Sequence, residues 1–114
     1  MLPIVNRLKK EKDFERVFKK GRSWKENFLY LKAANNSLKE SRFGFAVSKK
    51  FSPKATVRNK IKRRLREIIK TNLPCLKKGA DIVIIVLPGL EAGDFWELEE
   101  MVKRLLEKAG IVSK

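Results

Sequence analysis

The chain has 114 residues, of which 28 are lysine or arginine and 13 are aspartate or glutamate, giving a formal net charge of +15. Hydrophobic residues still make up 43% of the sequence, which predicts a folded basic domain over residues 1–114 and excludes a disordered tail. Such a charge favours a polyanionic partner, either nucleic acid or an anionic membrane surface.

Several classes of protein are disfavoured by what the sequence lacks. No stretch approaches the roughly 20 apolar residues that span a bilayer, and the N-terminus lacks a signal-peptide core, so we expect a cytoplasmic protein. Histidine is absent and Cys75 is the only cysteine, which excludes an internal disulfide and the usual zinc ligands. We therefore predict no catalytic residue and no metal site in the protein itself, and a buried or half-buried Cys75.

The N-terminal part of the chain is predicted to contain one short helix. Residues 1–10 read either as an extended basic arm or as a frayed terminus. Residues 12–20 carry an aromatic stripe at helical spacing, and Gly21 is expected to end that helix in the left-handed conformation. Periodicity alone favours a core role for the three residues of the stripe, Phe14, Val17 and Phe18.

Two strands are predicted next, over residues 28–34 and 42–50. In the first, Leu31 points to one face and Tyr30 to the other. In the second, bulky residues alternate with small ones, and the bare face forms a shallow trough over which another chain could lie. The small residues are Gly44, Ala46 and Ser48, and two cations follow them, Lys49 and Lys50.

Residues 55–72 predict a strongly basic amphipathic helix with Thr56 as its N-cap. Its apolar side suits a core, whereas the opposite side gathers Asn59, Lys62, Arg63, Arg66 and Lys70. Between residues 57 and 70 the only acid is Glu67, so the ion pairs that normally neutralise a solvated helix are almost absent. This imbalance favours an anion-binding face over a merely solvated one.

The C-terminal part predicts a buried strand and a last helix. Residues 81–87 form an unbroken apolar run, which is typical of a strand in the middle of a sheet. With the basic helix and the preceding strand it makes a βαβ unit, so the two strands should be parallel. Asp94 and Glu97 suggest a capping box for the last helix, which Gly110 ends. The predicted fold is an α/β (α+β) two-layer sandwich with about four strands in a mixed sheet and three helices.

Three segments resemble the protein subunit of bacterial ribonuclease P in order and spacing: RLKKEKDFERVFKKG, FGFAVSKK and KATVRNKIKRRLRE. The resemblance extends to about Glu67, and the later strand and helix are compatible with it. Its most specific part is the RNxxKRxxR pattern of Arg58, Asn59, Lys62, Arg63 and Arg66. Membership of this family implies a left-handed βαβ crossover, although the general rule predicts a right-handed one.

The same resemblance implies a function. The family's protein joins a large catalytic RNA and helps it to remove the 5′ leader from precursor tRNA. The RNA performs the hydrolysis with Mg²⁺, which agrees with a protein that has no catalytic residue. The implied partners are the ribonuclease P RNA and the precursor tRNA leader, with no DNA and no membrane.

The resemblance also assigns roles to individual residues. Those expected to bind RNA are Arg58, Asn59, Lys62, Arg63, Arg66, Lys49 and Lys50. Those expected in a cleft that holds the single-stranded leader are Phe14, Phe18, Leu31, Ala46 and Ser48. This interpretation replaces the core role that periodicity suggests for the aromatic stripe. Relatives often have an aromatic residue at the position aligned with Leu31, which would fit Tyr30 if the register differs by one.

Composition alone leaves other RNA- and anion-binding functions open. A ribosomal or RNA-chaperone protein could have the same charge and the same βαβ unit, but the aromatic stripe together with RNxxKRxxR favours ribonuclease P. A helix-turn-helix DNA-binding protein is disfavoured because strands flank the basic helix. Membrane-surface binding is disfavoured because the apolar side of that helix is needed for the core.

Overall fold

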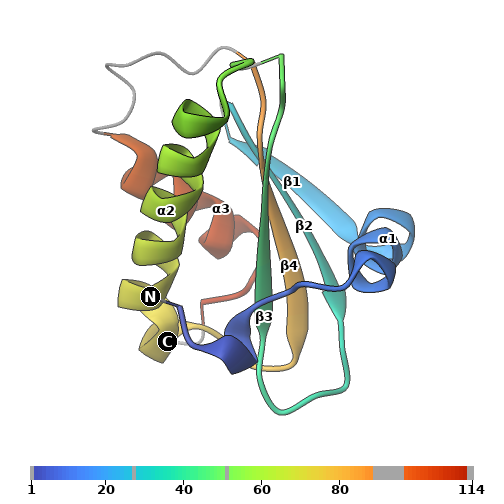
Figure 1. Ribbon diagram of the computed structural model, residues 1–114. Helices are drawn as coiled ribbons and strands as arrows, with labels where there is room; N and C mark the ends of the chain where they lie inside the picture. The colour runs from blue at the N-terminus through green and yellow to red at the C-terminus, as the bar shows by residue number, and fades with distance from the viewer. Residues whose placement is uncertain (1, 27, 51, 89–96, 113–114) are drawn as a thin grey trace.

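The computed structural model describes residues 2–26, 28–50, 52–88 and 97–112. The four strands form one sheet, with α1 on one side of it and α2 and α3 on the other (Figure 1). Two short 3₁₀ turns are labelled η. In chain order the elements are η1 (Ile4–Asn6), α1 (Glu11–Lys20), β1 (Arg22–Glu26), β2 (Leu29–Asn35), β3 (Arg42–Val47), α2 (Ala55–Asn72), η2 (Leu73–Cys75), β4 (Ala80–Val86) and α3 (Leu98–Lys108).

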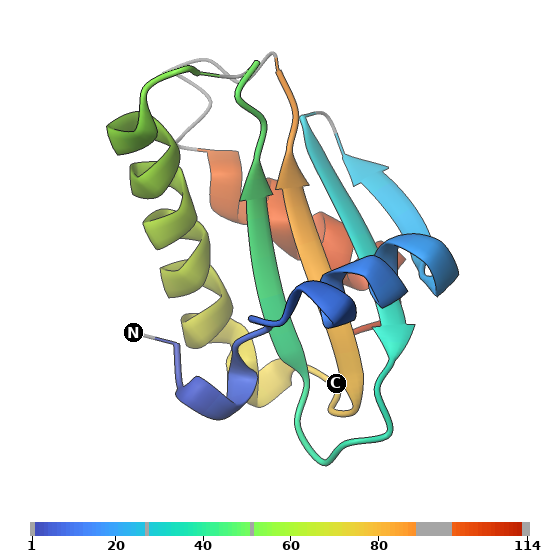
Figure 2. The same ribbon diagram turned by 45° about the vertical axis from the view of Figure 1, so that its right-hand side comes forward.

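The sheet has the strand order β1-β2-β4-β3, so the strand predicted to be central is an inner one. β3 and β4 are parallel, whereas the other neighbouring pairs are antiparallel, which confirms the mixed sheet and the βαβ unit. In Figure 2, α1 lies in front of the sheet, β3 and β4 run up the page with β4 to the right, and α2 packs with α3 on the far side. The connection from β3 through α2 to β4 thus passes behind the sheet and moves to the right, which makes the crossover left-handed. This is the handedness that the family resemblance implies, and it differs from the general rule.

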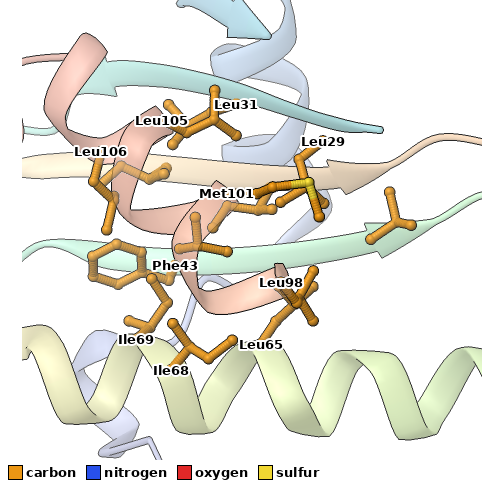
Figure 3. Packing of buried hydrophobic residues seen from close by; sticks show 14 of the residues in the cluster. Leu29, Leu31, Phe43, Leu65, Ile68, Ile69, Leu98, Met101, Leu105 and Leu106 are labelled. Atoms are coloured by element: carbon orange, nitrogen blue, oxygen red, sulfur yellow. The ribbon is translucent and has the colours of Figure 1, made fainter. Parts of the chain in front are cut away.

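The main core lies between the sheet and the α2–α3 layer (Figure 3). Leu29, Leu31 and Phe43 project from the strands toward Leu65 of α2 and Met101 of α3, and all five are at most 2% exposed. Burying a side chain of this size contributes roughly 1.5–3 kcal/mol. Ile61, Leu65, Ile68 and Ile69 of the basic helix are buried in this core, which leaves the cationic side of the helix for other contacts.

The N-terminal segment is docked against β3, so it is neither a free arm nor frayed. Leu2 and Leu8 are buried, and the Leu8 N–H donates to the Phe43 carbonyl at 2.9 Å. The Asn6 side-chain amide donates to the Ser41 carbonyl at 2.8 Å, which satisfies a buried polar group. These contacts fix the point from which the chain enters α1.

Gly21 follows α1 but has a φ of −75°, so the predicted left-handed stop is wrong. The residue is needed for a different reason, because a Cβ there would lie 2.4 Å from the Val17 carbonyl oxygen. Gly110 was predicted to end the last helix; it lies just beyond α3 and has a φ of +69°, in the left-handed region.

Other local predictions differ from the structure. α2 is preceded by Lys54 as N-cap, so Thr56 lies inside the helix and the predicted cap is wrong. Cys75 is the last residue of η2, which has no buried residue, and it is exposed, so its predicted burial is wrong. The predicted capping residue Asp94 lies outside the described residues.

β1 was not predicted, since the sequence RSWKE lacks an apolar run. Within the described part of the chain, no helix combines the length and the apolar character needed to cross a bilayer.

Candidate nucleic-acid interface

The face of the sheet opposite the main core is only partly covered. Strand register places Tyr30, Ile85 and Ala46 side by side on β2, β4 and β3, and all three are half-buried. α1 crosses the sheet nearer its other end, where Val17 packs on Val83 in a small apolar cluster (Figure 2). The row made by Tyr30, Ile85 and Ala46 therefore remains accessible beside the helix, and we call it the open strip.

Phe14 leaves α1 toward the sheet and lies directly over Gly44 of β3. A Cβ at position 44 would come within 2.5 Å of the Phe14 ring, so only glycine lets the ring rest on the backbone. The ring is half-buried, and it lines a cavity of about 340 Å³ where α1, β3 and α2 meet. The cavity is also lined by three cationic side chains, Arg7, Lys9 and Arg66. An aromatic ring and cations thus surround one recess.

Phe18 lies one helical turn further along α1 and is 41% exposed, so the stripe is not a sealed core face. The ammonium of Lys32 lies 5.7 Å from the centre of the Phe18 ring. That ammonium also donates to the Phe18 carbonyl at 3.1 Å, where a cation complements the C-terminal end of the helix. Lys32 therefore fixes both the backbone and the ring of Phe18.

The prediction that Leu31 lines the cleft is wrong. Its side chain is 0% exposed and points into the main core, because it pairs with Ile84 on the core side of the sheet. Tyr30, one residue earlier, points to the open strip. The strand therefore does present an aromatic residue on this face, but in the register that differs by one residue from the alignment. Lys32 shares that side and was not predicted, although the alternation of β2 already grouped it with Tyr30.

The small residues of β3 lead from the open strip to exposed cations. Ala46 and Ser48 are half-buried, and Lys49 and Lys50 are exposed just beyond them. The backbone N–H of Lys50 donates to the Ser48 hydroxyl oxygen at 3.0 Å, which holds the turn after the strand. Positive charge is thus placed at the end of the strip where the strand leaves the sheet.

Of the RNxxKRxxR pattern, Asn59, Arg63 and Arg66 lie on the side of α2 that faces away from the core, and Lys62 lies on its flank. Arg58 lies two turns before the buried Leu65, so it is near the core side of the helix. Asn59, Arg63 and Arg66 are exposed, whereas Arg58 and Lys62 are half-buried. The Arg58 guanidinium donates to the Ser52 carbonyl at 2.8 Å, so it also ties the helix to the preceding loop. We call Asn59, Lys62, Arg63 and Arg66 the basic face of α2. It joins the aromatic recess through Arg66, which lines the cavity beside Phe14.

A buried carboxylate lies under the other flank of α1. Asp81 of β4 is 0% exposed and accepts two hydrogen bonds from Arg42, at 2.8 and 2.7 Å. Arg16 of α1 and Asn36 also donate to it. These hydrogen bonds raise the pKa of Arg42 above its ordinary value. The sequence showed only an acid before an apolar run, and this network was not predicted.

Within the described ranges, no three acidic, cysteine or histidine side chains gather in a way that could hold a metal ion. The arrangement is instead suited to binding nucleic acid, because exposed cations can contact phosphates and exposed rings can stack on bases.

Replacing Gly44 by alanine is expected to weaken the binding of single-stranded RNA at the recess. The new methyl group must displace the Phe14 ring, since the two would lie 2.5 Å apart. RNA binding to Gly44→Ala, measured by fluorescence anisotropy, should fall several-fold, within the roughly 1–3 kcal/mol that one stacked base contributes. Ser23→Ala, at an exposed position of β1 outside the recess and the open strip, is the control and should bind normally. Equal affinities for the two variants would contradict the role of the recess.

Comparisons with known proteins agree with this geometry. A family model described as Ribonuclease P matches residues 2–110. The ribonuclease P protein component of Dictyoglomus turgidum is 37% identical over 114 residues, covering 98% of this chain and 95% of that protein. The solved structure of the Staphylococcus aureus RNase P protein has a TM-score of 0.82 at 32% identity, covering 94% of this chain and 97% of that one. The RNase P protein from Thermotoga maritima gives a TM-score of 0.76 at 34% identity, with 90% and 96% covered.

Proposed function

Because this chain belongs to the ribonuclease P protein family, we propose that its open strip and aromatic recess hold the single-stranded 5′ leader of precursor tRNA. As the protein component of this ribonucleoprotein endonuclease, the chain works with the ribonuclease P RNA in tRNA processing, and the RNA carries the catalysis. The alternative of a ribosomal or RNA-chaperone protein is not favoured by these relatives.

The observation that carries the proposal is that one exposed ring and two half-buried rings lie beside small residues, with cations at the recess and at the end of the open strip. Phe18 and Tyr30 offer aromatic surface on which a base can stack. Stacking of this kind accepts any base, which suits leaders of different sequence. Lys49 and Lys50 are exposed at one end of the strip, which supports the proposal that they contact the phosphates between the bases.

We assign the basic face of α2 to the RNA partner. Three of its side chains are exposed, and the helix carries only one acid, so the face has a strong positive field. That field would stabilise the folded RNA and the bound substrate, both of which are polyanions. We propose that Mg²⁺ is bound mainly by the RNA, and that the protein lowers the concentration required. We also propose that the protein acts in the cytoplasm, where bacteria make their precursor tRNA.

The function is tested by cleavage of a precursor tRNA by purified ribonuclease P RNA at low Mg²⁺, with and without this protein. Addition of the protein is expected to restore cleavage that the RNA alone performs poorly. An RNA chaperone would help only while the RNA folds, so the RNA is folded at high Mg²⁺ before dilution. Failure of the protein to stimulate such prefolded RNA would contradict the proposal.

Phe14→Ala is expected to reduce the affinity of the reconstituted enzyme for leader-bearing substrate about tenfold, the effect of losing one stacked base. Affinity for mature tRNA, which has no leader, should remain unchanged. Both affinities can be measured with labelled RNA in Ca²⁺, where cleavage is slow. An equal loss for the two RNAs would mean that Phe14 acts through folding of the protein.

A further inference from the structure

α1 has few apolar contacts with the rest of the protein. It is ten residues long, a length that is marginal for an isolated helix, and Val17 is its only fully buried residue. Val17 packs with Leu8 and Val83 in a cluster much smaller than the main core, and Phe14 adds a half-buried ring. With one fully buried side chain and one half-buried ring, apolar packing restricts the rotation of the helix only weakly, so polar contacts help to determine which way its flanks face.

Those contacts come from Arg16. One of its guanidinium nitrogens donates to the Asn35 carbonyl at 2.9 Å, and another pairs with the buried carboxylate of Asp81. Asp81 is itself held by Arg42, which lies on β3, and by Asn36. Arg42 also lies 3.4 Å from Asp13 of α1. Arg16 therefore attaches the helix to one end of β4 through a carboxylate that Arg42 and Asn36 also contact.

The geometry of the helix links this attachment to the aromatic rings. Successive residues turn by about 100°, so Arg16 and Phe18 leave α1 on opposite sides of Val17. Phe14, four residues before Phe18, lies on the same flank as that ring. When Arg16 is held on Asp81, both rings must face the other way, toward the open strip.

We propose that Asp81 and Arg16 are positioning residues that set the rotation of α1 and thereby aim Phe14 and Phe18 at the leader. The inference rests on the proposed function, because it assumes that these rings receive leader bases. It goes further in assigning part of the leader affinity to a buried ion pair that does not touch the RNA. Lys32, which holds the Phe18 carbonyl, supports the same orientation from the ring side.

Arg16→Met tests the inference, because it removes the attachment while Asp81 keeps Arg42 and Asn36 and the protein stays folded. In the reconstituted enzyme, the preference for leader-bearing over mature tRNA should fall about tenfold, as for the loss of one stacked base. Arg16→Lys should recover most of the preference, since its ammonium still pairs with Asp81. Lys20→Met, which removes an exposed charge from the same helix, should change it less than twofold. Urea unfolding of each variant verifies that it is folded.

A double-mutant cycle separates positioning from direct contact with RNA. If Arg16 acts by aiming the rings, Arg16→Met should have no further effect once Phe14 and Phe18 are both alanine. Additive losses would mean that Arg16 binds RNA itself, and they would overturn the inference. If Arg16→Met keeps the normal preference for leader-bearing tRNA while the variant with alanine at Phe14 and Phe18 loses it, the inference is overturned but the proposed function stands. A normal preference in the double alanine variant would overturn the proposed function as well.

Discussion

Asp81→Ala is expected to lower the free energy of unfolding by about 3 kcal/mol, the lower end of the range for breaking a buried ion pair. The substitution leaves Arg16 and Arg42 without their shared carboxylate, and it removes an acceptor from Asn36. The two arginine side chains are 30% and 23% exposed, so water can partly replace the lost hydrogen bonds. This partial hydration is the reason for choosing the lower end of the range.

Equilibrium unfolding in urea measures the effect, with an unchanged m-value as evidence that the variant still unfolds in one step. Glu40→Ala is the matched control, because Glu40 forms an exposed pair with Lys78 at 3.7 Å. Exposed pairs contribute about 0–1 kcal/mol, so the control should be nearly as stable as the parent. Similar stabilities for the two variants would show that the buried network contributes little.

Replacing Arg63 and Arg66 together by alanine is expected to reduce the salt dependence of binding to ribonuclease P RNA. Each arginine that neutralises a phosphate releases about one counterion, so the slope of log affinity against log salt should become less steep by about 2. Both side chains are exposed on the basic face of α2, and neither belongs to the buried core. The protein should therefore remain folded while its affinity falls most strongly at low salt.

The measurement is a set of binding titrations at four or more salt concentrations, with thermal unfolding as the check on folding. Lys77→Ala with Lys78→Ala is the control, because it removes the same charge from the exposed turn before β4. The control should keep the parental slope. If both double variants lose the same slope, binding depends on net charge and not on the basic face of α2.

Sequence patterns that extend over many residues predicted the structure well. The bounds of the basic helix were correct, because its apolar residues keep one period over five turns and four of them, Ile61, Leu65, Ile68 and Ile69, are buried in the main core. The apolar run of β4 predicted an inner strand because both of its faces are covered along most of its length. Both patterns could be read from the sequence because neighbouring residues of each element meet the same surroundings: the core on one side of α2, and covering layers on both faces of β4.

Features that depend on partners distant in sequence could not be predicted. Asp81 is held by side chains 65, 39 and 45 residues away, so its role became visible only in the folded chain. The position of Tyr30 and Leu31 depended on which face of β2 meets the core, and both residues are plausible on either face. The N-terminal segment has little periodicity, and its order comes from pairing with Phe43. In the site, the ring-bearing helix and the basic helix were predicted, but the polar network that orients one of them was not.

The strand order has a consequence for how the protein folds as it is synthesised. β2 and β3 are consecutive in sequence but are not neighbours in the sheet, since β4 lies between them. β3 therefore has no strand partner until residues 80–86 have left the ribosome, by which time most of the chain has been made. Pairing of this kind closes long loops and slows folding. We expect the chain to remain without a sheet core through most of its translation and to acquire its tertiary structure close to release.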